Sequence, residues 1–364
     1  MDIPLDCIYE ILTFSNPGDL LLCSQVNRDL YSLHYLESLW ESQENAKYNI
    51  LFNNTYYETS KTYYQINSLK RKLKLKHEVE TLYNLKEIYL NSKSITKLPQ
   101  EIVQLANLQK LELRDNQLTE LPREIRYLTN IQYLDLNHNK LKELPQEIQQ
   151  LNKLKVLILG NNNLEKITSI DQLTNLQRLE LHNNKIFKLP QEIKYLNNLH
   201  ELYLHGNQFI EFPSEIEQMK KLQKLSLNNN KLKKITPIIG QLTNLVYLWL
   251  NGNQLTELPL EIGHLINLQD LCLDDNCLTD VPLEINQLIN LRTLSLCKNK
   301  LTIFPSPISQ LFRLRRLELS DNQLTEIPSR KIRKLTKLKH LSIDKNMLTK
   351  YPYIIDMPYL NIYK

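Results

Sequence analysis

The residue types that could do chemistry in this chain are a few histidines and carboxylates placed at regular intervals. His182 and His205 are separated by 23 residues, and so are Glu112 and Asp135. Two imidazoles are potential metal ligands, and two carboxyl groups are potential partners in general acid–base catalysis. Whether either pair meets depends on the elements that carry it, and the shared interval of 23 residues indicates what those elements are.

A repeated pattern runs through most of the chain. Segments such as LQKLELRDNQL (108–118) and LVYLWLNGNQL (245–255) share the form LxxLxLxxNxL. An earlier unit (85–95) has Lys93 where the others have asparagine, which brings the number of units to twelve. The steps between asparagines are 23 residues, apart from one of 22 and one of 24, and the positions are 116, 139, 162, 184, 207, 230, 253, 276, 299, 322 and 346. Such a period is the signature of a stacked repeat architecture.

The pattern predicts how each unit folds. The alternating leucines face one side of a short strand, which a single unit cannot bury, so the units stack into a parallel sheet of about twelve strands. The asparagine lies where the strand bends away and satisfies backbone groups there. A second phrase, LPxEIxxLxxL, closes the outer wall, with Ile148 and Leu151 at helical i, i+3 spacing.

This pattern resembles the leucine-rich repeat family over about residues 82–352, specifically its 23-residue LPxEI class. The resemblance implies an α/β solenoid, curved, with one parallel sheet on its concave face. Two phrases depart from the pattern, ITSIDQL (167–173) and IPSRKIRKL (327–335). We expect both to change the local curvature of the outer wall without breaking the sheet.

The first residues do not follow the repeat. Three short amphipathic helical patterns occupy residues 3–40, with Pro17-Gly18 as a break between the first two. The order of features resembles the F-box, although Leu30 stands where that family usually has an aromatic residue. The matching residues are Ile3-Pro4, Ile11-Leu12, Asp19-Leu20, Val26 with Arg28, and Leu39-Trp40.

The F-box resemblance implies a small all-α domain that docks on the adaptor Skp1 of a cullin-based ubiquitin ligase. The residues expected to dock are Ile3, Pro4, Ile8, Ile11, Leu20 and Val26. The alternative is that these helices only cap the N-terminal end of the solenoid. The predicted organisation is an F-box-like domain (1–48), a helical linker and N-terminal cap (49–81), the repeats (82–350) and a C-terminal cap (351–364).

Binding in such an array is expected on the side chains between the leucines, which face solvent on the concave side. The central column of this face is Tyr89, Glu112, Asp135, Ile158, Glu180, Tyr203, Ser226, Trp249, Cys272, Ser295, Glu318 and Ser342. Trp249 has Tyr247 beside it and Tyr203 two strands away, at about 10 Å. With His182 and His205 these rings predict a protein-binding hot spot. A scatter of tolerated surface aromatics is the alternative.

The same register argues against catalysis, a metal and a cofactor. His182 and His205 lie on adjacent strands, but no third soft ligand lines up with them. Cys272 and Cys297 are offset diagonally by about 7–8 Å, which is too far for an unstrained disulfide. Carboxylates such as Glu112 lie on an open surface, where we expect no large pKa shift. No phosphate-binding glycine loop or nucleophile motif is present.

Composition limits the remaining classes. A net charge of +5 is small for 364 residues, and the basic runs at 70–76 and 330–339 are best explained as solvated faces, so nucleic acid is an unlikely partner. No apolar run is long enough for a membrane span, and no signal peptide is evident. Five cysteines without a CxxC pair suit a reducing cytoplasm or nucleus. Abundant Asn, Ile and Lys are typical of AT-rich genomes such as those of amoebal giant viruses.

These observations predict a non-enzymatic adaptor that binds a protein substrate on the repeats and a Skp1-like protein at its N-terminus. A plain repeat scaffold, whose N-terminus is only a cap, is the alternative.

Overall fold

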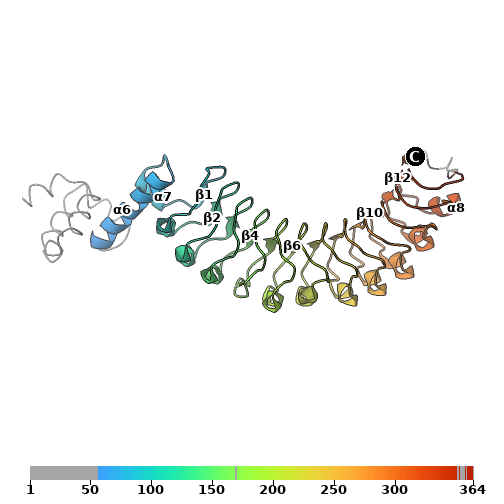
Figure 1. The fold of residues 1–364 in the computed structure, drawn as a ribbon, viewed down its shortest axis with the longest axis horizontal. Coiled ribbons are helices and arrows are strands. Elements are labelled where there is room, and N and C mark those ends of the chain that lie inside the picture. Colours follow the sequence, from blue (N-terminus) through green and yellow to red (C-terminus); the bar gives the residue numbers. More distant parts are fainter. Residues whose placement is uncertain (1–55, 169, 351, 353–356, 358, 364) are drawn as a thin grey trace, which may run out of the picture.

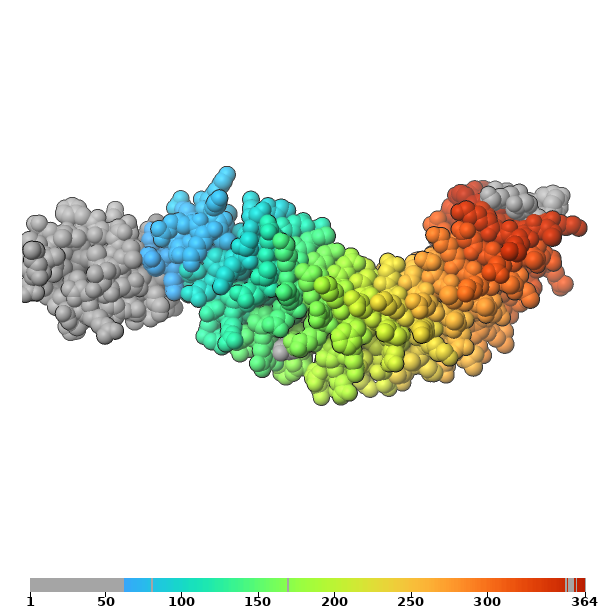
Figure 2. All heavy atoms as spheres, viewed as in Figure 1, coloured from blue at the N-terminus to red at the C-terminus, as the bar shows by residue number. Residues whose placement is uncertain are grey.

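The computed structural model describes residues 56–168, 170–350, 352, 357 and 359–363. The predicted F-box-like segment and its six docking residues lie outside these ranges. The described repeats form an arc with the strands along its inner side and short helical turns along its outer side (Figure 1). The space-filling view shows the same arc as one continuous body, hollowed on the side of the strands (Figure 2).

Each unit contributes one three-residue strand to a single parallel sheet. The strands follow one another in chain order from β1 to β13 without a crossover. They are β1 (Glu87–Tyr89), β2 (Lys110–Glu112), β3 (Tyr133–Asp135), β4 (Val156–Ile158), β5 (Arg178–Glu180), β6 (Glu201–Tyr203), β7 (Lys224–Ser226), β8 (Tyr247–Trp249), β9 (Asp270–Cys272), β10 (Thr293–Ser295), β11 (Arg316–Glu318), β12 (His340–Ser342) and β13 (Asn361–Tyr363). The register pairs equivalent positions of neighbouring units, such as Tyr203 with Ser226 and Ser226 with Trp249, which confirms the predicted central column.

The outer wall consists mainly of short 3-10 helices, which begin after the proline of the second phrase except in η6, where Thr236 takes the place of that proline. They are η1 (Gln100–Gln104), η2 (Arg123–Tyr127), η3 (Gln146–Gln150), η4 (Gln191–Tyr195), η5 (Ser214–Gln218), η6 (Pro237–Gln241), η7 (Leu260–His264), η8 (Leu283–Gln287) and η9 (Ser306–Gln310). The Leu151 amide donates to the Ile148 carbonyl, so the predicted i, i+3 spacing has its counterpart in an i→i+3 hydrogen bond. Both side chains are fully buried against the strand leucines.

The asparagines form a ladder along the array. The side-chain amide of Asn207 donates to the carbonyl oxygens of Leu204 (3.0 Å) and, in the preceding unit, Leu181 (2.9 Å). Its side-chain oxygen accepts a hydrogen bond from the backbone N–H of Ile186 at 3.0 Å. Equivalent bonds recur from Asn116 to Asn346. Each asparagine therefore joins its own bend to the previous unit, as the sequence predicts.

The two irregular phrases change the outer wall and leave the sheet intact. No helical turn is found in the described residues between β4 and β5, whose strands nevertheless pair in register. The longer phrase forms the short α-helix α8 (Ser329–Ile332) in place of a 3-10 turn. The C-terminal segment differs from expectation, because residues 361–363 add a thirteenth strand beside β12.

Two helices cover the N-terminal end of the core. In α6 (Tyr56–Lys72), Ile66 and Leu69 are fully buried. Leu82 of α7 (Val79–Tyr83) is also fully buried. None of the helices in the described part of the chain has the length and apolar character that a bilayer crossing requires.

Candidate partner-binding face

The five side chains predicted to form a hot spot lie together on the concave side of β5 to β8. Tyr203 ends β6, and Tyr247 and Trp249 begin and end β8. His182 and His205 occupy equivalent positions two residues beyond the central column of β5 and β6. All five are partly buried. The repeat places them on one face because positions two residues apart in a strand point the same way.

The rings of these five residues form one continuous band. His182 stacks on His205, with ring centroids 4.6 Å apart and planes 9° apart. His205 meets Tyr203 edge-on at 6.5 Å, Tyr203 stacks with Trp249 at 6.4 Å, and Trp249 lies 5.6 Å from Tyr247. These separations fall within the range of favourable aromatic pairs. We name these five residues the aromatic band.

Small residues next to the aromatic band allow the rings to meet. Tyr203 and Trp249 are two strands apart, yet their ring centroids are 6.4 Å apart, which is less than the expected spacing of about 10 Å. Ser226 lies between them in the register and is 2% exposed, so its small side chain leaves room for the two rings. At the other end, His182 lies on the backbone of Gly160. A β-carbon at position 160 would come within 2.2 Å of the His182 ring.

The surroundings of His182 and His205 favour the neutral form of both imidazoles. Burial and the neighbouring His182 lower the pKa of His205 to about 4, and burial also lowers the pKa of His182. His182 Nε2 lies 3.2 Å from the Asn161 amide nitrogen, and His205 Nδ1 lies 3.1 Å from Ser226 Oγ. At neutral pH the pair is therefore an uncharged stacked surface and a poor choice for a proton-transfer catalyst.

Charged groups surround the rings. Arg178 lies over the Tyr203 ring at 5.4 Å and pairs with Glu180 and Glu201. Lys224 lies over the Tyr247 ring at 5.7 Å and is 2.9 Å from Glu201. Glu201 also accepts a hydrogen bond from the Tyr203 hydroxyl at 3.1 Å. Burial, followed by the charge of Glu201, raises the pKa of Tyr203 to about 12.

Burial also shifts the pKa of several other groups on this face, and the shifts that are large belong to thiols and rings and not to carboxylates. Burial raises the pKa of Asp135 and of Asp274, and it raises the pKa of Cys297 to about 11. Burial and a hydrogen bond to Asp270 raise the pKa of Cys272 as well. Both thiols are free and stay protonated at neutral pH, so neither is an activated nucleophile. Within the described ranges, no three His, Cys, Asp or Glu residues gather as metal ligands would.

Comparison with protein families identifies the array. The leucine-rich repeat region model matches residues 110–182 and 229–350, and the single leucine-rich repeat model matches 175–196 and 198–219. The chain belongs to the leucine-rich repeat family. The F-box domain model matches residues 1–33, so this leucine-rich repeat protein carries an N-terminal F-box domain. That combination is typical of non-catalytic substrate adaptors of Skp1–cullin ubiquitin ligases.

Solved structures support the fold of the leucine-rich repeat array. A leucine-rich repeat protein of Leptospira interrogans is 36% identical, with 79% of this chain and 86% of that chain covered and a TM-score of 0.62. An internalin of Listeria monocytogenes is 22% identical over 82% and 93% of the two chains, with a TM-score of 0.68, and shows the fold alone. Drosophila Toll, in a complex with Spätzle, is 28% identical over 70% and 35%, with a TM-score of 0.62. No curated protein matches the chain significantly.

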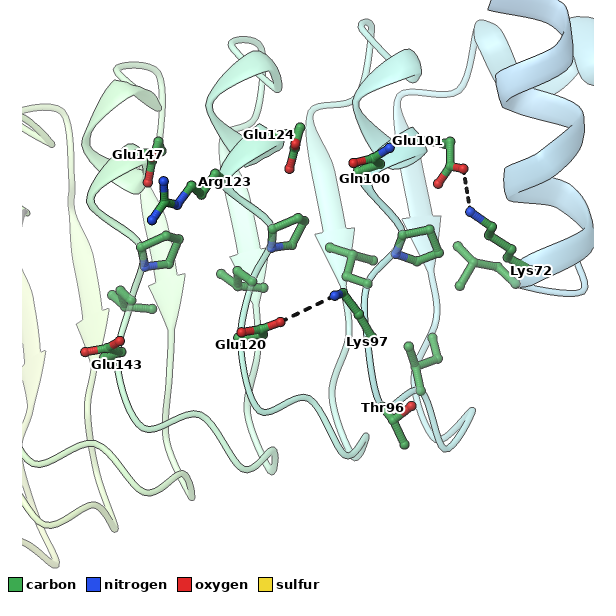
Figure 3. Close-up of a pocket in the computed structure, with 18 of the residues that line it drawn as sticks. Lys72, Thr96, Lys97, Gln100, Glu101, Glu120, Arg123, Glu124, Glu143 and Glu147 are labelled. Atoms are coloured by element: carbon green, nitrogen blue, oxygen red, sulfur yellow. Dashed lines mark hydrogen bonds and ion pairs between the residues drawn. The ribbon is translucent and has the colours of Figure 1, made fainter.

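A second surface of the leucine-rich repeat array is an open hollow of about 1340 Å³ along its first units, below α6. Figure 3 shows a row of prolines from successive LPxE phrases, with Lys97 directed toward Glu120 and Lys72 toward Glu101. Five cations and five glutamates line the hollow; they are Lys72, Lys74, Lys93, Lys97 and Arg123, and Glu101, Glu120, Glu124, Glu143 and Glu147. The charges balance and the groups do not converge on one point, so the hollow is a weaker candidate than the aromatic band.

Sequence reasoning located the aromatic band and missed the groups around it. Arg178 is in the predicted register, but its position over Tyr203 depends on side-chain conformation. Asp270 accepts a hydrogen bond from the indole N–H of Trp249 at 3.2 Å, a contact that the repeat register does not predict. The available signal was that the first residues of strands β5 to β9 are Arg178, Glu201, Lys224, Tyr247 and Asp270, which places these charges beside the rings.

Proposed function

We propose that this protein is a substrate adaptor of a Skp1–cullin ubiquitin ligase and performs no chemistry itself. The observation that carries the proposal is the pairing of an F-box domain with a repeat array that presents a clustered aromatic face. The F-box docks a Skp1-like protein through Ile3, Pro4, Ile8, Ile11, Leu20 and Val26. No cofactor or metal takes part.

The substrate is a protein that contacts the aromatic band. Large amphipathic rings on a solvent-facing sheet have no core of their own to join, and such rings dominate the energetics of protein interfaces. Toll, which is similar to this array, is described in a complex with Spätzle. That example supports recognition of a protein by an array of this kind and does not identify the substrate.

The capping helices weaken the alternative of a plain scaffold. In that alternative, the segment at residues 3–40 exists to cover the exposed leucines of the first repeat. In the structure α6 and α7 already cover them, with Ile66, Leu69 and Leu82 fully buried. A separate role for the N-terminal segment is therefore the simpler explanation.

F-box proteins generally act inside cells, which supports a cytoplasmic or nuclear location for this activity. The five cysteines without a CxxC pair agree with a reducing compartment.

A binding assay with purified Skp1 and the full chain tests the proposal. We expect the wild type to retain Skp1, and the triple change Ile3→Ala, Pro4→Ala and Leu20→Asp to abolish retention. Trp249→Ala is the matched control, and it should retain Skp1 because it alters only the concave face. Circular dichroism should show that both variants keep the repeat array folded. Failure of the wild type to bind Skp1 would favour the plain scaffold.

A further inference from the structure

One arrangement of three groups recurs on the concave face. Near the N-terminal end, Lys110 lies over two rings, at 5.0 Å from the centroid of Tyr89 and 4.9 Å from that of Tyr133. Its ammonium group is also 2.9 Å from a carboxylate oxygen of Glu112. The cation thus has aromatic faces and a carboxylate together, a favourable environment because both attract positive charge.

The same arrangement occurs twice within the aromatic band. Arg178 lies over Tyr203 and pairs with Glu201, and Lys224 lies over Tyr247 and pairs with the same glutamate. Each of these rings therefore has a cation supplied by the protein itself. These contacts also tie up the positive charges, so Arg178 and Lys224 do not confer a net positive charge on the band.

At Trp249 the same arrangement is incomplete, because the ring lies beside a carboxylate but no cation of the described residues lies over it. Its indole N–H donates to Asp270 Oδ1, and the Cys272 thiol donates to the same oxygen at 3.0 Å. Across the part of the chain that the structure describes, Asp270 makes no ion pair and its second carboxylate oxygen accepts no hydrogen bond. In the same part of the chain no Lys or Arg lies over the indole, which is only partly buried.

The strands beyond Trp249 reinforce this negative charge. From β9 to β12 the concave columns carry Asp270, Asp274, Glu318 and Asp344. The only Lys or Arg in those columns is Arg316, which is held 2.7 Å from Glu318. The chain as a whole carries a net charge of +5, so this part of the face differs in sign from the average. It should attract a basic partner and repel phosphate groups.

We propose that the substrate segment recognised by this face is basic, and that one of its Arg or Lys side chains lies on Trp249 and pairs with Asp270. This inference rests on the proposed role of the concave face in substrate binding. Tryptophan is the most favourable ring for a cation, and Asp270 holds the indole in place while keeping one oxygen free for the incoming group. Further basic residues of the segment face Asp274 and Glu318.

Fluorescently labelled deca-arginine and decaglutamate, titrated with the full chain, test the charge preference. We expect deca-arginine to bind and decaglutamate not to bind, although the chain itself is net positive. Asp270→Asn should weaken deca-arginine binding about tenfold, since it removes the charge and keeps an oxygen for the indole N–H. Glu112→Gln is the matched control and should change binding less than about twofold, because Glu112 already pairs with Lys110.

Three outcomes would overturn the inference: equal deca-arginine affinity for wild type and Asp270→Asn, preferential binding of decaglutamate, or affinity that does not fall between low and high salt. Circular dichroism of Asp270→Asn should match the wild type.

Failure of this inference can be separated from failure of the proposed function by capturing proteins from a cell lysate on the full chain. If proteins are lost with Trp249→Ala but retained with Asp270→Asn, the proposed adaptor role is supported and the inference of a basic substrate segment is rejected. If proteins are retained with Trp249→Ala, the hypothesis that this face binds the substrate is rejected as well.

Discussion

The asparagine ladder and the concave face lie on the same units and follow opposite rules. Along the ladder, equivalent positions carry the same side chain and make the same hydrogen bonds from Asn116 to Asn346. On the face, equivalent positions of β6, β7 and β8 are Tyr203, Ser226 and Trp249. The comparison teaches that stability and recognition reside in different columns of one repeat, so a change in one should leave the other largely intact.

The largest effect should follow from Asn207→Leu. Four backbone groups would lose a hydrogen-bond partner, namely the carbonyls of Leu181, Leu204 and His205 and the N–H of Ile186. We expect the free energy of unfolding to fall by about 3 kcal/mol, measured by urea denaturation. Gln208→Leu makes a similar amide-to-leucine change at an exposed neighbour and should stay within about 0.5 kcal/mol. An unchanged midpoint for Asn207→Leu would show that the ladder is not structural.

Gly160→Ala tests whether the face can also affect stability. The new methyl group would collide with the His182 ring, and we expect a loss of about 1–3 kcal/mol in the same denaturation assay. Adding His182→Ala should restore most of that loss by removing the obstructing ring. If the double variant is no more stable than Gly160→Ala alone, the contact with the His182 ring does not set the cost.

Trp249→Ala should affect binding far more than folding. Substrate affinity should fall by about 2 kcal/mol, roughly thirtyfold, because an interface anchor is lost. Because the indole is only partly buried, the unfolding midpoint should move little. Glu112→Ala, several strands away, should change affinity little in the same calorimetric titration. If Trp249→Ala unfolds, the indole is part of the core, and stability and recognition do not depend on separate columns of the repeat.

A pH dependence of stability should follow from the histidine pair. The pKa of folded His205 is about 4, below its ordinary value of 6.5, and that of His182 is lowered too. The unfolded chain therefore binds more protons between these values, and stability should fall as the pH drops from 6.5 toward 4. Replacing His205 with glutamine should flatten this part of the stability profile, followed by thermal melting across the pH range. An unaltered slope would mean that other groups dominate the acid response.

The sequence was sufficient to predict the backbone of the repeats and the side chains that line their concave side. The 23-residue period alone places Trp249, Tyr203 and the two histidines on the concave side, because the strand register repeats with the period. The asparagine contacts were predictable for the same reason. Strand β13 was not predicted, because Asn361–Tyr363 lacks the leucine pattern and joins the sheet through backbone hydrogen bonds to β12.

Contacts between side chains from different units could not be predicted in the same way. The approach of Tyr203 to Trp249 depends on the size of Ser226 between them, and the position of Arg178 depends on two glutamates. The raised pKa of Asp274 likewise results from burial, which the periodicity does not report. The period fixes which residues are neighbours, and packing among those neighbours fixes what they contact.

The ladder also makes the array a spacer of adjustable length. Because each asparagine links its unit to the preceding one through the same backbone groups, a unit could be inserted or removed without altering the joints on either side. One additional unit between α7 and β5 would move the aromatic band away from the N-terminal cap by about 4.8 Å, one strand spacing, and would rotate it slightly along the arc. The reach between the two ends of the molecule is therefore set in discrete steps, one per repeat.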